Sequence, residues 1–178
     1  MISNQRVSKG YKVAPKSIKE IRSIALAARE AFNYVDNAPG MFIERLISEG
    51  VIHVVEDDSP LLAKSIEGFY SPSAMCMLMR DRDYIASVES TNGRSLFTFA
   101  HEFGHMILGH ERTLNREETL EHKAFEDSEW QANTFAAEFL MPLPIIEAKD
   151  MRIPEELCEE FGVSFDAARW RLRKLGRI

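Results

Sequence analysis

The sequence predicts an α+β domain in which a small, mostly antiparallel sheet packs against helices. Three observations lead to this class: helical apolar spacing up to residue 50, short β-branched runs with turn signals after it, and helical spacing again from residue 95 onward. Apolar residues make up 45% of the 178 residues and charged residues 28%, so the chain can form the core of one domain.

Two helices are expected before the sheet. Ser17 opens an S-x-x-E capping box with Glu20, and apolar residues follow at helical spacing, which predicts a helix over 17–33. A second, short helix is expected over 39–49, where Gly50 can end it.

The strands are expected in the middle of the chain. β-branched and apolar runs predict strands over 51–55, 66–70, 74–80 and 84–89. Turn-forming residues separate the later runs at 71–73 and 81–83. Runs joined by such short turns indicate a small, mostly antiparallel sheet.

The second half of the chain should be helical. Apolar spacing predicts helices over 95–110, 127–140, 154–161 and 165–174. Pro142 and Pro144 would end the second of these helices. The last two helices form a short C-terminal pair.

The strongest functional signal is His101-Glu102-Phe103-Gly104-His105. Four residues turn an α-helix by about 400°, so His101 and His105 share one face and can reach the same metal ion. Glu102 lies about 100° around the helix, where its carboxylate can approach a metal-bound water without binding the metal. The pattern predicts a zinc site in which Glu102 is the general base.

The helix that carries this motif is apolar on nearly all sides, so it should be buried in the domain. Two histidines and a glutamate are costly to bury unless a partner satisfies them. A metal ion does so, which favours a ligand site over an accidental pair of core histidines.

The third ligand must come from a later segment. Leu108 and Glu111 occupy the positions where the metzincin arrangement needs glycine and histidine. Glu129 is the preferred ligand, because small residues on its helix face would let that helix lie close to the motif helix. Glu126 is the alternative.

The other histidines and both cysteines are expected to be structural. His110 is interpreted as a polar residue at a helix end, His122 as solvent-facing, and His53 as a core or edge residue of a strand. Cys76 and Cys158 lie in apolar surroundings and form no C-x-x-C spacing, so we expect free thiols and no cysteine-based zinc site.

Two separate motifs carry a family resemblance. The first is Phe97-Thr98-Phe99-Ala100-His101-Glu102-Phe103-Gly104-His105, and the second runs from Glu129-x-x-Ala132-Asn133 to Met141-Pro142. In this order they resemble the ImmA/IrrE family of metallopeptidases. The resemblance covers roughly residues 50–175 and is strongest over 94–142. Phe103 and Phe139 stand where leucine is usual in the family, which is an exchange between apolar residues.

The resemblance implies a zincin-like core and a zinc-dependent endopeptidase of bacteria, their prophages or mobile elements. It implies that His101, His105 and Glu129 hold Zn²⁺ and that Glu102 is the base. The implied substrate is a protein, namely a helix-turn-helix transcriptional repressor. A cytoplasmic location is expected, because the N-terminus lacks the apolar segment of a secretory signal and no run is long enough to span a membrane.

Three parts are expected along the chain: a flexible arm over 1–16, the metallopeptidase domain over 17–150, and a helix-turn-helix-like subdomain over 151–178. The last ten residues are rich in arginine and lysine, which would suit DNA binding by the final helix. The net charge of −6 favours the other interpretation, in which this pair packs on the protease core or holds the substrate.

A second function is kept open. The chain could be a metal-stabilised binding module that sequesters a regulator, or one member of a toxin–antitoxin pair, without cutting its partner. The presence of Glu102 beside the two histidines favours the enzyme, because a binding module has no need of a base at the metal.

Overall fold

The computed structural model describes residues 10–36, 38–61, 68–71, 76–88, 93–110 and 122–178. In chain order the elements are α1 (Ile18–Ala31), α2 (Pro39–Ser48), β1 (Ile52–Val55), β2 (Gly68–Ser71), β3 (Cys76–Arg80), α3 (Asp81–Val88), α4 (Gly93–Ile107), η1 (Ala124–Glu126), α5 (Ser128–Leu140), α6 (Leu143–Ala148), α7 (Pro154–Phe161) and α8 (Phe165–Lys174). None of the helices in this part of the chain has the length and hydropathy needed to cross a membrane.

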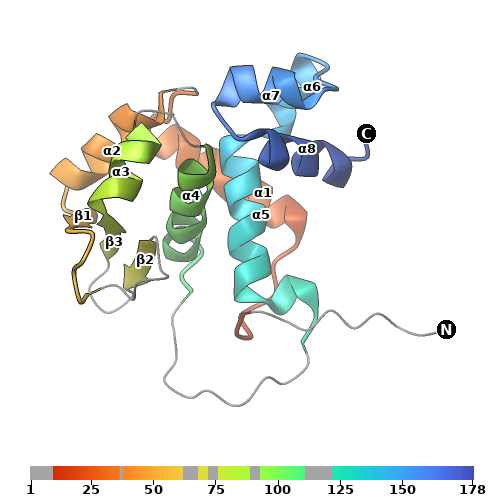
Figure 1. The fold of residues 1–178 in the computed structure, drawn as a ribbon. Helices are drawn as coiled ribbons and strands as arrows, with labels where there is room; N and C mark the ends of the chain where they lie inside the picture. Colours follow the sequence, from red (N-terminus) through yellow and green to blue (C-terminus); the bar gives the residue numbers. More distant parts are fainter. Residues whose placement is uncertain (1–9, 37, 62–67, 72–75, 89–92, 111–121) are drawn as a thin grey trace.

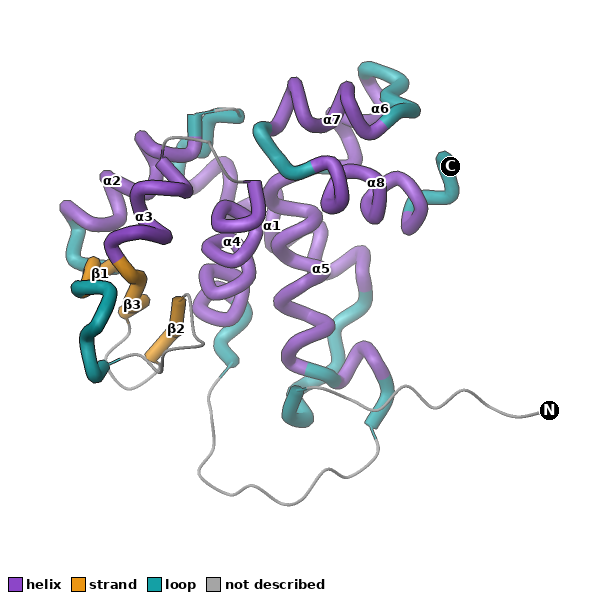
Figure 2. The backbone as a smooth tube through the Cα atoms, in the orientation of Figure 1, coloured by secondary structure: helices purple, strands orange, loops and turns teal. Residues whose placement is uncertain are grey.

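Helix α5 is the central element of the fold, because it packs against both α4 and α1. The sheet, α2 and α3 lie beside α4, and α6 to α8 gather at the C-terminal end of α5 (Figures 1 and 2). The α+β class expected from the sequence is confirmed, with helices as the larger part.

The sheet differs from the expectation. Its described strands have the order β1-β3-β2, with β1 parallel to β3 and β2 antiparallel to β3. The expected mostly antiparallel sheet is therefore wrong, because the sheet is mixed. The reason is that β3 enters between β1 and β2 and pairs once in each direction. Strand order depends on long-range packing, which short turn signals do not report.

The fourth expected strand, 84–89, is also wrong where the structure describes it, since residues Asp81–Val88 form α3. The sequence prediction treats Asp81 and Asp83 as a turn signal. Both instead stand in the first turn of the helix, where negative charge suits the positive end of the helix dipole. The hydroxyl of the buried Ser87 donates to the Asp83 carbonyl at 2.7 Å within the helix.

The other expected helices are confirmed, and their caps follow from the sequence. The backbone N–H of Glu20 donates to Ser17 Oγ at 3.2 Å, and the N–H of Ser17 donates to Glu20 Oε2 at 2.7 Å. Ser164 caps α8 by accepting from the N–H of Ala167 at 3.3 Å. Gly162 ends α7 with a φ of 67°, a conformation that favours glycine.

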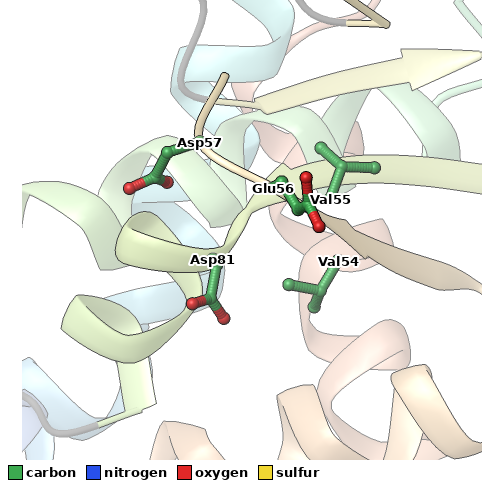
Figure 3. A pocket seen from close by; sticks show the side chains of 5 residues that line it. All are labelled: Val54, Val55, Glu56, Asp57 and Asp81. Atoms are coloured by element: carbon green, nitrogen blue, oxygen red, sulfur yellow. The ribbon is translucent and has the colours of Figure 1, made fainter. Parts of the chain in front are cut away.

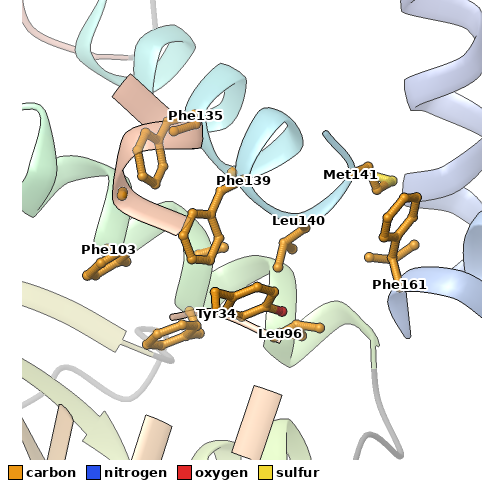
Figure 4. Packing of buried hydrophobic residues seen from close by; sticks show 14 of the residues in the cluster. Tyr34, Leu96, Phe103, Phe135, Phe139, Leu140, Met141 and Phe161 are labelled. Carbon is orange, nitrogen blue, oxygen red and sulfur yellow. The ribbon is translucent and has the colours of Figure 1, made fainter. Parts of the chain in front are cut away.

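A group of aromatic rings fills the centre of the core (Figure 4). The ring centroid of Phe103 lies 5.4 Å from those of Phe32, Phe42 and Phe139, and 6.0 Å from that of Phe135. These residues come from the end of α1 and from α2, α4 and α5. Because Phe103 belongs to the histidine motif, this packing holds the motif helix in the core.

A buried ion pair joins the C-terminal helices to the domain. Both carboxylate oxygens of Glu138 on α5 accept from Arg171 on α8, at 2.9 and 2.7 Å, and from Arg22 on α1, at 3.0 Å each. Gly93 lies tightly against the turn before α8, since an added Cβ would be 2.2 Å from the backbone nitrogen of Ser164. The C-terminal pair therefore packs on the core, and Arg171 is buried within it.

The described part of the expected N-terminal arm is hydrogen-bonded to the domain. The N–H of Val13 donates to the Glu126 carbonyl at 2.8 Å, and the N–H of Ser128 donates to the Tyr11 carbonyl at 3.0 Å. Residues 10–16 thus lie along the start of α5. Residues 1–9 of the predicted arm lie outside the described residues, and the division into three parts stays a prediction.

Replacement of Arg171 by alanine should lower the free energy of unfolding by about 3 kcal/mol, because it leaves the buried Glu138 with one cationic partner instead of two. Arg173→Ala is the matched control: this residue is exposed on the same helix, and its loss should change stability by less than about 0.5 kcal/mol. Urea unfolding measures both values. Equal effects of the two substitutions would contradict the role of the ion pair.

Stability should also depend on the ionisation of Glu138. Burial raises the pKa of Glu138, but hydrogen bonds from Arg171 and Arg22 outweigh burial, so the pKa is lowered below its ordinary value of 4.5. Such a group stabilises the fold above its unfolded pKa and loses this contribution as the pH falls through its folded pKa. We expect Tm to fall less steeply below about pH 4.5 in Glu138→Gln than in the wild type. Parallel Tm curves for the two proteins would contradict this expectation.

Candidate metal centre

Two helices bring the candidate ligands together. Helix α4 carries His101 and His105, and α5 carries Glu129 in its first turn. The side chain of Asp127 caps α5 by accepting from the backbone N–H of Trp130 at 2.7 Å. This cap sets where α5 begins, and therefore where Glu129 lies relative to α4.

The three side chains converge on one point. His101 Nε2 lies 3.2 Å from Glu129 Oε2, His105 Nε2 lies 3.3 Å from Glu129 Oε1, and the two Nε2 atoms are 3.1 Å apart. One ligand atom from each residue lies within 4.8 Å of the other two. Two imidazole nitrogens and a carboxylate oxygen fit a three-ligand zinc site, and a cation there would offset the close approach of the two nitrogens.

The close approach of α4 and α5 depends on Gly104. A Cβ atom added at this position would lie 2.9 Å from Phe135 Cδ1 and 3.2 Å from the Ala132 carbonyl oxygen, both on α5. A larger residue would separate the helices and with them the histidines from Glu129. Ala132 is fully buried at this contact, in line with the small residues that the sequence places there.

The electrostatics of the cluster follow from these contacts. Burial lowers the pKa of His101, but its hydrogen bond with Glu129 and the charges of Glu129 and Glu102 outweigh burial, so the pKa is raised. Hydrogen bonds with His101 and His105 hold the pKa of Glu129 far below its usual range. The cluster therefore contains an ionised carboxylate at neutral pH.

The two remaining glutamates considered from the sequence lie in different places. Glu102 directly follows His101, is half-buried, and is close enough for its charge to raise the pKa of that histidine. The alternative ligand Glu126 is occupied elsewhere: its carboxylate accepts from the N–H of Lys123 at 3.1 Å and lies 3.6 Å from Lys12 Nζ. Glu126 is not part of the histidine cluster.

Sequence reasoning missed two histidine contacts. His110 is 2% exposed, and its Nδ1 lies 2.9 Å from His105 Nδ1. Burial lowers the pKa of His110 to about 4, although a hydrogen bond with Gln131 opposes this effect. His122 was expected to face solvent, and this is wrong: its side chain is 2% exposed, and its Nε2 lies 2.9 Å from Asp127 Oδ2. Asp127 stands five residues after His122 and caps α5, so the charged stretch around His122 contained this partner without indicating the contact.

A surface pocket lies at the sheet. It is lined by Val54, Val55, Glu56, Asp57 and Asp81 (Figure 3). No member of the histidine cluster lines it, and its three carboxylates are exposed groups at the end of β1 and the start of α3. Exposed acidic side chains are common on protein surfaces, so this pocket supports no functional argument. His53 was expected as a core or edge residue of a strand, and it is an exposed residue of β1, an outer strand of the described sheet. Cys76 and Cys158 are free thiols, as expected.

A family model described as the IrrE N-terminal-like domain, a peptidase family, matches residues 80–173. The match spans more than half of the chain. The chain belongs to this family. The resemblance found in the two motifs is therefore confirmed, and the matched region of the IrrE N-terminal-like domain includes His101, His105 and Glu129. Helices α1 and α2 and the N-terminal segment lie before it.

The fold has a solved counterpart. A Mycobacterium tuberculosis structure described as a transcriptional regulator is similar, with a TM-score of 0.52 and 18% sequence identity. The similarity covers 85% of this chain and 54% of that protein, so this IrrE N-terminal-like chain spans about half the length of its structural counterpart. At this identity the likeness concerns the fold alone. No curated protein matches the chain.

The metal cluster leads to a direct prediction. Wild-type protein should bind about one Zn²⁺ per chain, and His101→Ala or Glu129→Ala should weaken binding by more than about 100-fold, because each removes one of three ligand atoms. Competition with a chromophoric chelator measures the affinity. The control is His53→Ala, an exposed histidine on β1, which should bind like the wild type. Unchanged affinity in Glu129→Ala would exclude that carboxylate as a ligand.

Proposed function

We propose that this member of the IrrE N-terminal-like family is a zinc-dependent endopeptidase with a zincin-like active site. The observation that supports the proposal is the convergence of His101, His105 and Glu129 within 4.8 Å, beside the glutamate of an H-E-x-x-H motif. In the proposed site these three residues hold Zn²⁺. When bound, zinc would supply Lewis acidity and lower the pKa of a water molecule at its open position.

Glu102 is proposed as the general base. It lies one residue after His101 on α4, so its side chain leaves the helix about 100° away from the ligand face. Its half-burial, and the effect of its charge in raising the pKa of His101, support this role for the carboxylate. In this role it can accept a proton from the attacking water and later donate it to the leaving amine.

The sheet offers a place for an extended substrate. Strand β2 is one of the two edge strands in the described order β1-β3-β2, and it contacts α4, the motif helix. Among the described strands it pairs with β3, and we propose its other edge as the place where a peptide adds as a strand. We propose that the substrate chain runs along β2 and passes the metal on α4.

The proposed substrate is a helix-turn-helix transcriptional repressor in the bacterial cytoplasm. This part of the proposal rests on the resemblance to the ImmA/IrrE family. A general protease would be harmful inside a cell, which favours one narrow substrate. The alternative, a metal-stabilised partner that sequesters a regulator without cutting it, uses the same metal cluster but needs no base.

The experiment compares wild type with Glu102→Gln on a helix-turn-helix repressor encoded beside this chain. Glu102→Gln should bind zinc like the wild type and lose at least about 100-fold in cleavage rate, because it keeps the ligands and removes the proton acceptor. The matched control is Glu44→Gln, an exposed glutamate on α2, which should cut normally. Cleavage is followed by electrophoresis and mass spectrometry of the fragments.

The other outcomes separate the two functions. A stable complex of wild type with the repressor, with zinc present and no cut bond, would support the sequestering partner instead. Full cleavage by Glu102→Gln would remove this residue from the chemistry. Absence of zinc binding in the wild type would contradict the proposed site itself.

A further inference from the structure

The chain turns at the end of α4 so that the imidazole of His110 packs against that of His105. The N–H of Gly109 donates to the Met106 carbonyl at 3.2 Å, the N–H of His110 donates to the His105 carbonyl at 3.0 Å, and Gly109 has a φ of 67°. This is a Schellman ending, in which the residue after the left-handed glycine packs over the residue five positions before it. The rings of His105 and His110 meet here, with centroids 5.0 Å apart.

Gln131 on α5 contacts the other side of the His110 ring. The backbone groups around Gln131 determine the orientation of its side-chain amide. Gln131 Nε2 lies 2.8 Å from the carbonyl oxygens of both Ala14 and Phe125. Carbonyl oxygens only accept, so this atom must be the amide nitrogen that donates to both. Gln131 Oε1 is consequently the acceptor that faces His110 Nε2 at 3.1 Å.

The proton positions follow in order from this amide. His110 must carry its hydrogen on Nε2 to donate to Gln131. A neutral imidazole has one N–H, so His110 Nδ1 is an acceptor. His105 Nδ1, which lies 2.9 Å away, must then be a donor. When His105 is neutral, this leaves its Nε2 without a hydrogen and directed at Glu129 and His101.

A matching arrangement holds the other histidine. Asn133 Nδ2 donates to the Glu129 carbonyl at 2.8 Å, so Asn133 Oδ1 is the acceptor that faces His101 Nδ1 at 3.3 Å. His101 therefore also carries its hydrogen on Nδ1 when neutral and presents Nε2 to the cluster. Asn133 acts directly on its histidine, whereas Gln131 acts through a second imidazole.

We infer that His110 and Gln131 are positioning residues, which hold His105 in the tautomer that can bind a metal. In the opposite tautomer, Nε2 would carry a hydrogen at the place where the metal must bind. His110 is 2% exposed and Gln131 is fully buried, so the contacts between them are made inside the protein. The last acceptors in the series are two backbone carbonyls, one of them in the N-terminal segment. This inference rests on the metal site of the proposed function.

The first test is the tautomer of His105 in metal-free wild-type protein, read from long-range ¹H–¹⁵N NMR spectra. The expected result for the neutral ring is a hydrogen on Nδ1, and a neutral ring with its hydrogen on Nε2 would overturn the inference. This measurement needs neither zinc nor activity, so it can succeed or fail independently of the peptidase proposal.

The second test measures Zn²⁺ affinity by chelator competition in two variants of one residue. His110→Ala removes the acceptor for His105 Nδ1 and should weaken zinc binding by about 10–100-fold, with a mixture of His105 tautomers. His110→Asn places an amide oxygen near the position of the ring Nδ1 and should restore most of the affinity. A merely structural role would predict no such rescue of the tautomer.

The controls separate positioning from folding. His53→Ala should keep both the affinity and the His105 tautomer of the wild type, because His53 is exposed on β1. Thermal unfolding of each metal-free variant shows whether it is folded before zinc is added. Wild-type affinity in a folded His110→Ala, or equal losses in His110→Ala and His110→Asn, would overturn the inference.

Discussion

The close contact between α4 and α5 at Gly104 is the constraint on which the rest of the structure depends. Each helix contributes part of the cluster of His101, His105 and Glu129 that could hold a metal, and neither can form it alone. The missing side chain at Gly104 lets the carbonyl of Ala132 and the ring of Phe135 approach α4. This distance in turn decides whether two imidazoles and a carboxylate can meet. The motif therefore sets a packing distance as well as supplying two of the candidate ligands.

The remaining elements hold this helix pair in place from other sides. Phe103 packs among rings from the end of α1 and from α2 and α5, which anchors the motif helix in the core. At the opposite end of α5, Glu138 ties the helix to α1 and α8 through two arginines. An ion pair of this kind is costly to bury, and it is satisfied here by four hydrogen bonds. Arg171, one of the basic residues of α8, is therefore buried in this ion pair.

A shell of hydrogen bonds around the cluster extends to parts of the chain outside the family match. The carbonyl of Ala14 receives a hydrogen bond from Gln131, and an added Cβ at Gly10 would lie 2.8 Å from Glu129 Cγ. The N-terminal segment thus lies directly against the residues that support the metal ligands. Metal geometry depends on such outer contacts, because they orient each ligand and set its protonation. The described N-terminal residues therefore contact the surroundings of the candidate metal centre.

Local signals determined much of this protein. Helix periodicity, the Ser17–Glu20 capping box and the H-E-x-x-H spacing each act within one or two turns of chain, so the sequence alone predicted most helices and the candidate ligands. The sequence indicated Glu129 as the third candidate ligand because its helix face carries small residues, which is again a local pattern.

Long-range packing decided the rest. The direction of β1 relative to β3 depends on strands that are distant in sequence. The helical state of residues 81–88 and the burial of His122 also escaped the sequence prediction. The contact of His110 with His105 depends on both local sequence and tertiary structure. Gly109 before His110 is a local signal for a helix ending that brings residue 110 over residue 105. The hydrogen position on His110, however, depends on Gln131. Only the tertiary structure brings Gln131 to the ring, because a hydrogen-bond series across two helices leaves no period in the sequence.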